Sequence, residues 1–157
     1  MKVTKRVTFE SSHHLDNPDL PFREAKEIFG KCFGYHSRSG RVKGKEIFHG
    51  HSYKCEVTVE GERSWNTGFL INFKNLKEIV NKHIVDLFDH NCLNDVMPKK
   101  YWPTTVENML LFIIEKTDII DDISFASGGG NLQSIKIWET EDSFAEWNPP
   151  EQCGCVV

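Results

Sequence analysis

The spacing of apolar residues in this chain changes from a period of two to helical spacing and back, which limits the folds open to it. Near the start, Val3, Val7 and Phe9 occupy odd positions between polar residues and predict a half-buried strand. A second alternating segment covers 49–60, with apolar side chains at positions 53, 55, 57 and 59. Both segments are expected to belong to a sheet with one buried face.

Two helices are predicted after these strands. Segments 72–88 and 105–117 carry apolar residues three and four positions apart, which is typical of one face of a helix. Alternation then returns from about Ile135 to Thr140 and again over 143–147. The order strand, strand, helix, helix, strand, strand predicts an α+β domain: a four-stranded antiparallel sheet with two helices on one face.

Length and composition indicate one globular domain over 1–157. Hydrophobic residues make up 39% of the chain and charged residues 27%, which is ordinary for a folded domain. The segment 16–48 contains two prolines and four glycines, and a loop of that length is usually functional or mobile. The tail from about 149 is expected to be loose.

Charge and hydropathy argue against several partners. The net charge is −4 and like charges do not form long runs, so a nucleic-acid partner is not expected. No apolar stretch approaches about 18 residues and the start lacks a signal-peptide core, which predicts a cytoplasmic protein without a membrane partner.

The cysteines are expected to be reduced thiols. There are five, an odd number without CxxC spacing, so a disulfide framework is a poor interpretation. Cys153 and Cys155 are expected to lie in the loose tail without a chemical role.

The run His49-Gly50-His51 is the strongest local signal for chemistry. On a strand, residues two apart point to the same face, so both imidazoles project together. The inward phase of the first strand, continued from Phe9, arrives at His13 and not at His14. If the two strands pair, three histidines meet, which is the ligand pattern of a catalytic zinc. A pair of exposed or hydrogen-bonded histidines is the alternative.

Other polar residues are candidates for the same site. Asp89 precedes His90, and a carboxylate beside an imidazole can orient it for proton transfer, although a polar helix end would look the same. His83 falls in an apolar helical stripe and is expected in the core. Glu139 lies in phase with buried strand residues, so it is expected to bind a partner such as the guanidine-like edge of a heterocycle.

Six motifs together carry a family resemblance. FESSHHL, HGHSYK, GFLINFKNLK, DHNCLN, TTVEN and IWETE stand in the order and spacing of the 6-pyruvoyl tetrahydropterin synthase/6-carboxytetrahydropterin synthase family. The resemblance covers nearly all of the chain from Val3 to about Thr140. It implies the tunnelling fold, in which trimers stack into a homo-hexamer with active sites between subunits.

The resemblance also implies roles for individual residues. His13, His49 and His51 would hold Zn²⁺, and Asp89 and His90 would relay protons. The pterin would be bound by Glu139 together with residues at the start of the second predicted helix, Thr105 and Glu107. The substrate would be the pterin triphosphate 7,8-dihydroneopterin triphosphate.

The identity of the catalytic base is left open between two residues. Cys32, in a GKC run that resembles the surroundings of the catalytic cysteine in carboxy-type enzymes, is the first candidate. It lies further from His49 than the family places its cysteine, so 33–48 would be largely an insertion. Glu46 stands where a folate-pathway branch has a glutamate. A further departure is Asn72, where the family usually has an aspartate.

These features favour a zinc-dependent lyase that forms 6-carboxy-5,6,7,8-tetrahydropterin for deazapurine (queuosine-type) synthesis. The alternatives are a 6-pyruvoyl tetrahydropterin synthase and a glutamate-using enzyme that forms 6-hydroxymethyl-dihydropterin. An inactive pterin- or metal-binding module is the alternative from another class.

Overall fold

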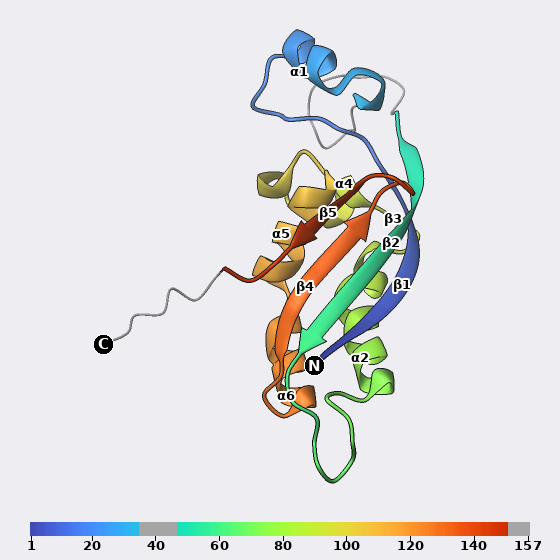
Figure 1. The fold of residues 1–157 in the computed structure, drawn as a ribbon. Coiled ribbons are helices and arrows are strands. Elements are labelled where there is room, and N and C mark those ends of the chain that lie inside the picture. The colour runs from blue at the N-terminus through green and yellow to red at the C-terminus, as the bar shows by residue number, and fades with distance from the viewer. Residues whose placement is uncertain (35–46, 151–157) are drawn as a thin grey trace, which may run out of the picture.

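The computed structural model describes residues 1–34 and 47–150. Five strands form one sheet in the order β3-β1-β2-β4-β5 (Figure 1). Their bounds are β1 Lys2–His13, β2 His49–Glu60, β3 Asn91–Cys92, β4 Asn131–Trp138 and β5 Phe144–Trp147. The predicted α+β class is confirmed, and the four strands expected from sequence all occur.

The two longest strands, β1 and β2, pair antiparallel along their whole length. Phe9 lies opposite Tyr53, Ser11 opposite His51, and His13 opposite His49. Alternation of buried and exposed residues fixes this register, because a slip by one residue would turn every apolar side chain to the other face.

The sheet differs from the prediction in two respects: it has five strands and it is mixed. The additional strand β3 has only two residues and runs parallel to β1, pairing Asn91 with Ser11 and Cys92 with Ser12. A two-residue strand leaves no alternation in the sequence, and so the four-stranded antiparallel prediction was wrong on this point.

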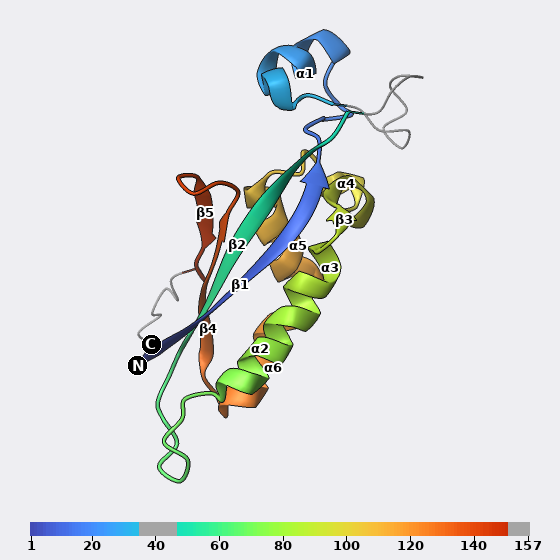
Figure 2. The same ribbon diagram turned by 90° about the vertical axis from the view of Figure 1, so that its right-hand side faces the viewer.

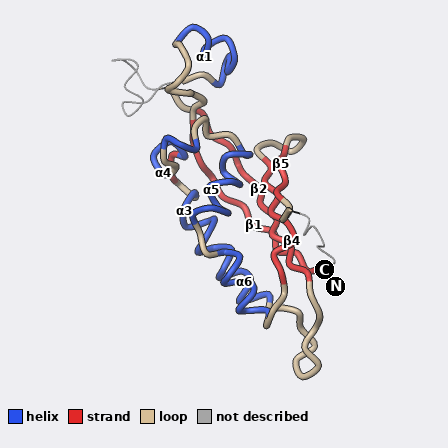
Figure 3. The backbone as a smooth tube through the Cα atoms, turned by 90° about the vertical axis from the view of Figure 1, so that its left-hand side faces the viewer, coloured by secondary structure: helices blue, strands red, loops and turns tan. Residues whose placement is uncertain are grey.

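The helices of the domain body cover one face of the sheet, as Figures 2 and 3 show. The predicted helix over 72–88 is continuous: α2 (Phe73–Val80) passes through a π-helical turn (Asn81–Val85) into α3 (Asp86–Phe88). The other predicted helix is α5 (Val106–Lys116). Shorter pieces are α4 (Leu93–Val96) and two 3₁₀ turns, Gly30–Cys32 and Lys99–Tyr101.

Besides the four-residue α4, two helices of eight or more residues were missed by the sequence prediction. Helix α6 (Ile119–Ser127) packs against α2 and β4 and buries Ile119 and Ile123, so more than two helices cover this face. Its boundaries were visible in Asp118 before it and in Gly128 after it, which adopts the left-handed conformation that ends many helices. Helix α1 (Phe22–Phe29) lies within the expected loop 16–48 and stands apart at one end of the sheet (Figure 1).

Among the residues that the structure describes, no helix is both long and apolar enough to cross a membrane. The expected loose tail, with Cys153 and Cys155, falls from residue 151 onward outside the described residues, and so does Glu46.

His83 is buried, as its place in the apolar stripe predicted, but it also has an ionic partner. Its Nε2 lies 2.7 Å from Oδ2 of Asp122, and Nζ of Lys82 lies 2.8 Å from the same oxygen. Asp122 therefore ties α6 to the helix that begins with α2.

We expect Asp122→Ala to lower the free energy of unfolding by about 1–3 kcal/mol, because the buried imidazole of His83 loses its partner. Urea unfolding followed by circular dichroism measures the change. The matched control is Asp121→Ala, at the exposed neighbouring position. Equal losses of unfolding free energy in the two variants would contradict a stabilising contact between Asp122 and His83.

Candidate metal centre

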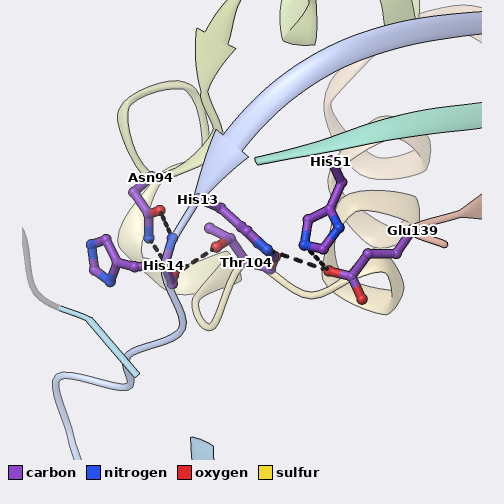
Figure 4. Close-up of polar contacts among 6 residues, drawn as sticks. All are labelled: His13, His14, His51, Asn94, Thr104 and Glu139. Atoms are coloured by element: carbon purple, nitrogen blue, oxygen red, sulfur yellow. Dashed lines mark hydrogen bonds and ion pairs between the residues drawn. The ribbon is translucent and has the colours of Figure 1, made fainter. Parts of the chain in front are cut away.

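Three histidines from β1 and β2 converge at one end of the sheet. One ring nitrogen from each of His13, His49 and His51 lies within 4.8 Å of the corresponding nitrogens of the other two. His14, the next residue of the chain, turns its ring away from this cluster (Figure 4). Strand phase therefore selects His13, as the sequence predicted, and the three histidines could form a metal site.

The tautomer of His13 is fixed by a backbone carbonyl. Its Nδ1 lies 2.9 Å from the carbonyl oxygen of Thr104, which can only accept a hydrogen bond, so Nδ1 carries the hydrogen. Nε2 of the neutral ring then presents a lone pair to the cluster. Histidine ligands of metals are commonly oriented in this way by their second nitrogen.

Glu139 reaches the same cluster from the end of β4. Its Oε1 lies 3.3 Å from Nε2 of His13 and 3.7 Å from Nε2 of His51 (Figure 4). Burial lowers the pKa of His13 to about 4, so its ring is neutral near pH 7. The lone pair on Nε2 of His13 and the carboxylate oxygen of Glu139 then face each other and repel. A bound cation would offset this repulsion.

His49 supports the same interpretation. Its Nε2 is buried and has no hydrogen-bond partner among the described residues. Burial, and secondarily the neighbouring His51, lowers the pKa of His49. Buried polar atoms normally have a hydrogen-bond partner, so a buried ring nitrogen without one, in a cluster of three imidazoles, fits a metal ion. The residues present therefore fit the zinc that the sequence resemblance implies.

The residues expected to bind the substrate surround one hollow beside the histidines. Thr105, Glu107 and Glu139 line a cavity of about 250 Å³, together with Leu15, Val106, Ser143 and Phe144. Thr105 caps the N-terminus of α5, with its Oγ1 accepting from the N–H of Asn108 at 3.5 Å. The cavity thus combines two carboxylates with the positive end of a helix.

Asp89 and His90 are paired with each other, and among the described residues neither belongs to the cluster of three histidines. Oδ2 of Asp89 is 2.9 Å from Nδ1 of His90, whose side chain is 83% exposed. The N–H of Glu10 donates to Asp89 and lowers its pKa. His90 has a φ of 56°, uncommon for a residue other than glycine. It lines a hollow of about 480 Å³ that His51 of the histidine cluster also lines, together with Glu10, Ser12, Ser52 and Cys92.

Cys32 lies near the strand end that carries His13. The N–H of Leu15 donates to the carbonyl of Cys32 at 2.9 Å, and the thiol is exposed. Gly34 permits this close approach, because a Cβ there would come within 2.6 Å of Cβ of His14. Among the described residues, the cluster within coordination distance contains only the three histidines, so Cys32 is not one of the candidate ligands.

Sequence reasoning missed three buried polar residues around the histidines. Asn94 and Thr104 hydrogen-bond to the backbone at His14, and no pattern in the sequence links these distant positions. Tyr53 could have been found, because it continues the phase of His49 and His51. Its buried hydroxyl has no hydrogen-bond partner among the described residues.

We expect the metal-free protein to lose stability as the pH falls from 6.5 towards 4. In this window the unfolded chain takes up a proton at His13 that the folded chain does not bind, so the free energy of unfolding decreases. Urea unfolding at about pH 7 and about pH 5 measures the loss. His13→Gln should lose less over the same interval, and an equal loss in both proteins would contradict the assignment.

Comparison with known proteins identifies the family of the chain. Residues 2–150 match the family model for 6-pyruvoyl tetrahydropterin synthase. A 6-pyruvoyl tetrahydrobiopterin synthase of Dictyostelium discoideum is 35% identical over 143 residues, covering 90% of this chain and 91% of the relative. A 6-carboxy-5,6,7,8-tetrahydropterin synthase of Haemophilus influenzae is 26% identical and covers 93% of this chain and 97% of the relative.

Solved structures show the same fold. The Caenorhabditis elegans 6-pyruvoyl tetrahydropterin synthase superposes with a TM-score of 0.70 at 22% identity, covering 94% of both chains. A Plasmodium vivax 6-pyruvoyltetrahydropterin synthase, solved with a catalytic glutamate replaced by cysteine, gives a TM-score of 0.55 at 16% identity and covers 94% of this chain and 97% of that one. With the family match over nearly its whole length and a relative of this similarity, the chain belongs to the 6-pyruvoyl tetrahydropterin synthase family.

Proposed function

We propose that the protein is a zinc-dependent lyase acting on 7,8-dihydroneopterin triphosphate. The observation that carries the proposal is the convergence of His13, His49 and His51, with the lone pair of neutral His13 facing the carboxylate of Glu139. Three neutral imidazoles with an open position are the ligand set of a catalytic zinc. Such a zinc, when bound, polarises substrate oxygens and makes neighbouring hydrogens more acidic.

The protein's own residues bind the substrate and move its protons. Glu139 accepts hydrogen bonds from the amino-pyrimidine edge of the pterin, and Thr105 and Glu107 line the same hollow. Cys32, close to the end of β1, removes a proton from the side chain of the substrate as a thiolate. Asp89 orients His90, which exchanges protons with the substrate.

A second copy of the chain completes the site in this proposal. His90 is exposed and lines a different hollow from the one that contains Glu139. The exposed imidazole of His90 can serve the histidine cluster of a neighbouring subunit. We therefore propose a homo-oligomer, a hexamer built from two trimers, with active sites between subunits.

The relatives favour the 6-pyruvoyl product. The Dictyostelium relative that bears this name is 35% identical, whereas the Haemophilus relative named for the carboxy product, which the sequence alone favoured, is 26% identical. The carboxy product remains the second candidate, because an Archaeoglobus fulgidus relative named as a putative carboxy synthase is also 35% identical, over 111 residues. Mass identification of the product distinguishes the two. A zinc-loaded protein that forms no product would contradict the lyase proposal.

We expect His51→Ala to lose both bound zinc and turnover, because two imidazoles hold the ion far more weakly than three. Plasma mass spectrometry of the dialysed protein gives the zinc content. The matched control is His83→Ala, which removes a buried histidine outside the cluster and should retain zinc. Full zinc occupancy in His51→Ala would contradict the proposed ligands.

We expect Cys32→Ala to retain zinc but to lose turnover by about 100-fold or more, because the proton acceptor is removed. Glu46→Ala is the comparison, since a Plasmodium vivax family member has a catalytic glutamate. Steady-state kinetics on both variants tests the choice. A large loss in Glu46→Ala together with an active Cys32→Ala would reverse it and favour the hydroxymethyl product.

A further inference from the structure

We propose that Asn94 is a positioning residue for the proposed zinc ligand His13. The inference rests on the metal site of the proposed function. Its basis is a side-chain clamp that holds the peptide groups of the residue following His13 (Figure 4).

Asn94 bonds to both backbone polar groups of His14. Its Oδ1 accepts the N–H of His14 at 2.9 Å, and its Nδ2 donates to the carbonyl of His14 at 3.1 Å. The side chain of Asn94 is buried, with 1% of the residue exposed. One carboxamide thus pairs with a residue as a neighbouring strand would, by exchanging two hydrogen bonds.

The hydrogen bonds from Asn94 continue the backbone pairing of β1 with β3 beyond the point where β3 ends. Strand β3 pairs with Ser11 and Ser12 of β1 and ends at Cys92, because α4 begins at Leu93 and turns the chain away. On this side of β1, no residue of β3 is therefore paired with His14. The side chain of Asn94 takes that place by bonding to the N–H and the carbonyl of His14.

The clamp at His14 restricts the position of His13. On one side of the strand, His13 pairs with His49, and on the other it lies between Ser12, held by β3, and His14, held by Asn94. Thr104 adds a third constraint, since its Oγ1 donates to the carbonyl of His14 at 3.1 Å while its carbonyl receives Nδ1–H of His13.

Loss of the clamp should therefore loosen His13 before it affects the rest of the fold. The ring would keep its chemistry but its Nε2 would no longer be held towards the other two histidines. Partners that orient a metal ligand typically contribute 10- to 100-fold to metal affinity. We expect Asn94→Ala to weaken zinc binding within that range.

The test is the zinc dissociation constant of the full-length protein, measured by competition with a chromophoric chelator. Wild type is compared with Asn94→Ala, with Asn94→Leu, which keeps the number and branching of side-chain heavy atoms, and with Asn72→Ala as the control. Asn72 also uses Oδ1 to accept a backbone N–H, that of Lys74 at 2.8 Å, but it caps α2 far from the histidines.

The expected result is a zinc dissociation constant about 10- to 100-fold higher in both Asn94 variants and unchanged in Asn72→Ala. The visible spectrum of bound Co²⁺ should change in the same two variants, a signature that lost stability alone would not produce. Thr104→Val, which removes one of the two donors to the carbonyl of His14, should have a smaller effect in the same direction.

The outcomes separate the inference from the proposed function. Wild type that binds zinc, together with Asn94 variants that bind it within about twofold as tightly, would overturn the positioning role and leave the metal site intact. Wild type that binds no zinc would overturn both. Because Asn94→Leu leaves no cavity at position 94, a cavity effect confined to Asn94→Ala would not obscure the answer.

Discussion

The antiparallel register between β1 and β2 is the constraint on which the rest of the structure depends. It places His13 opposite His49 and Ser11 opposite His51, so three imidazoles from two distant segments meet at one end of the sheet. The same register buries Phe9 against Tyr53 and forms the first layer of the core. A shift of one residue would disperse both the metal ligands and the core, so fold and site are determined together.

Burial gives the histidine cluster its chemical character. His13 is desolvated and its pKa is lowered to about 4, so near pH 7 the ring offers a lone pair in place of a positive charge. Its other nitrogen is bound to the carbonyl of Thr104, and the lone pair faces the carboxylate of Glu139. Neutral donors beside an anion form a site that favours a cation, and the hollow lined by Glu139 and Thr105 adjoins it.

Sequence alone predicted the strands and helices whose apolar residues recur at a regular spacing. Alternation identified the strands and selected His13 over its neighbour, and helical spacing identified 72–88 and 105–117. The two-residue strand β3 and the side-chain clamp of Asn94 have no periodic signal, because each depends on a few contacts between segments distant in the chain. Helix α6 is different: its capping residues were readable, and its short apolar pattern was overlooked. The placement of Cys32 beside β1 depended on the close approach at Gly34, which spacing could not reveal.

The central claim is that three histidines from β1 and β2 hold a zinc ion. X-ray absorption at the zinc edge of the loaded protein tests it most directly, because scattering identifies the ligand atoms. The account predicts three imidazole nitrogens at about 2.0–2.1 Å and no sulfur ligand. A sulfur shell at about 2.3 Å, or a spectrum without the multiple scattering of imidazole rings, would contradict it.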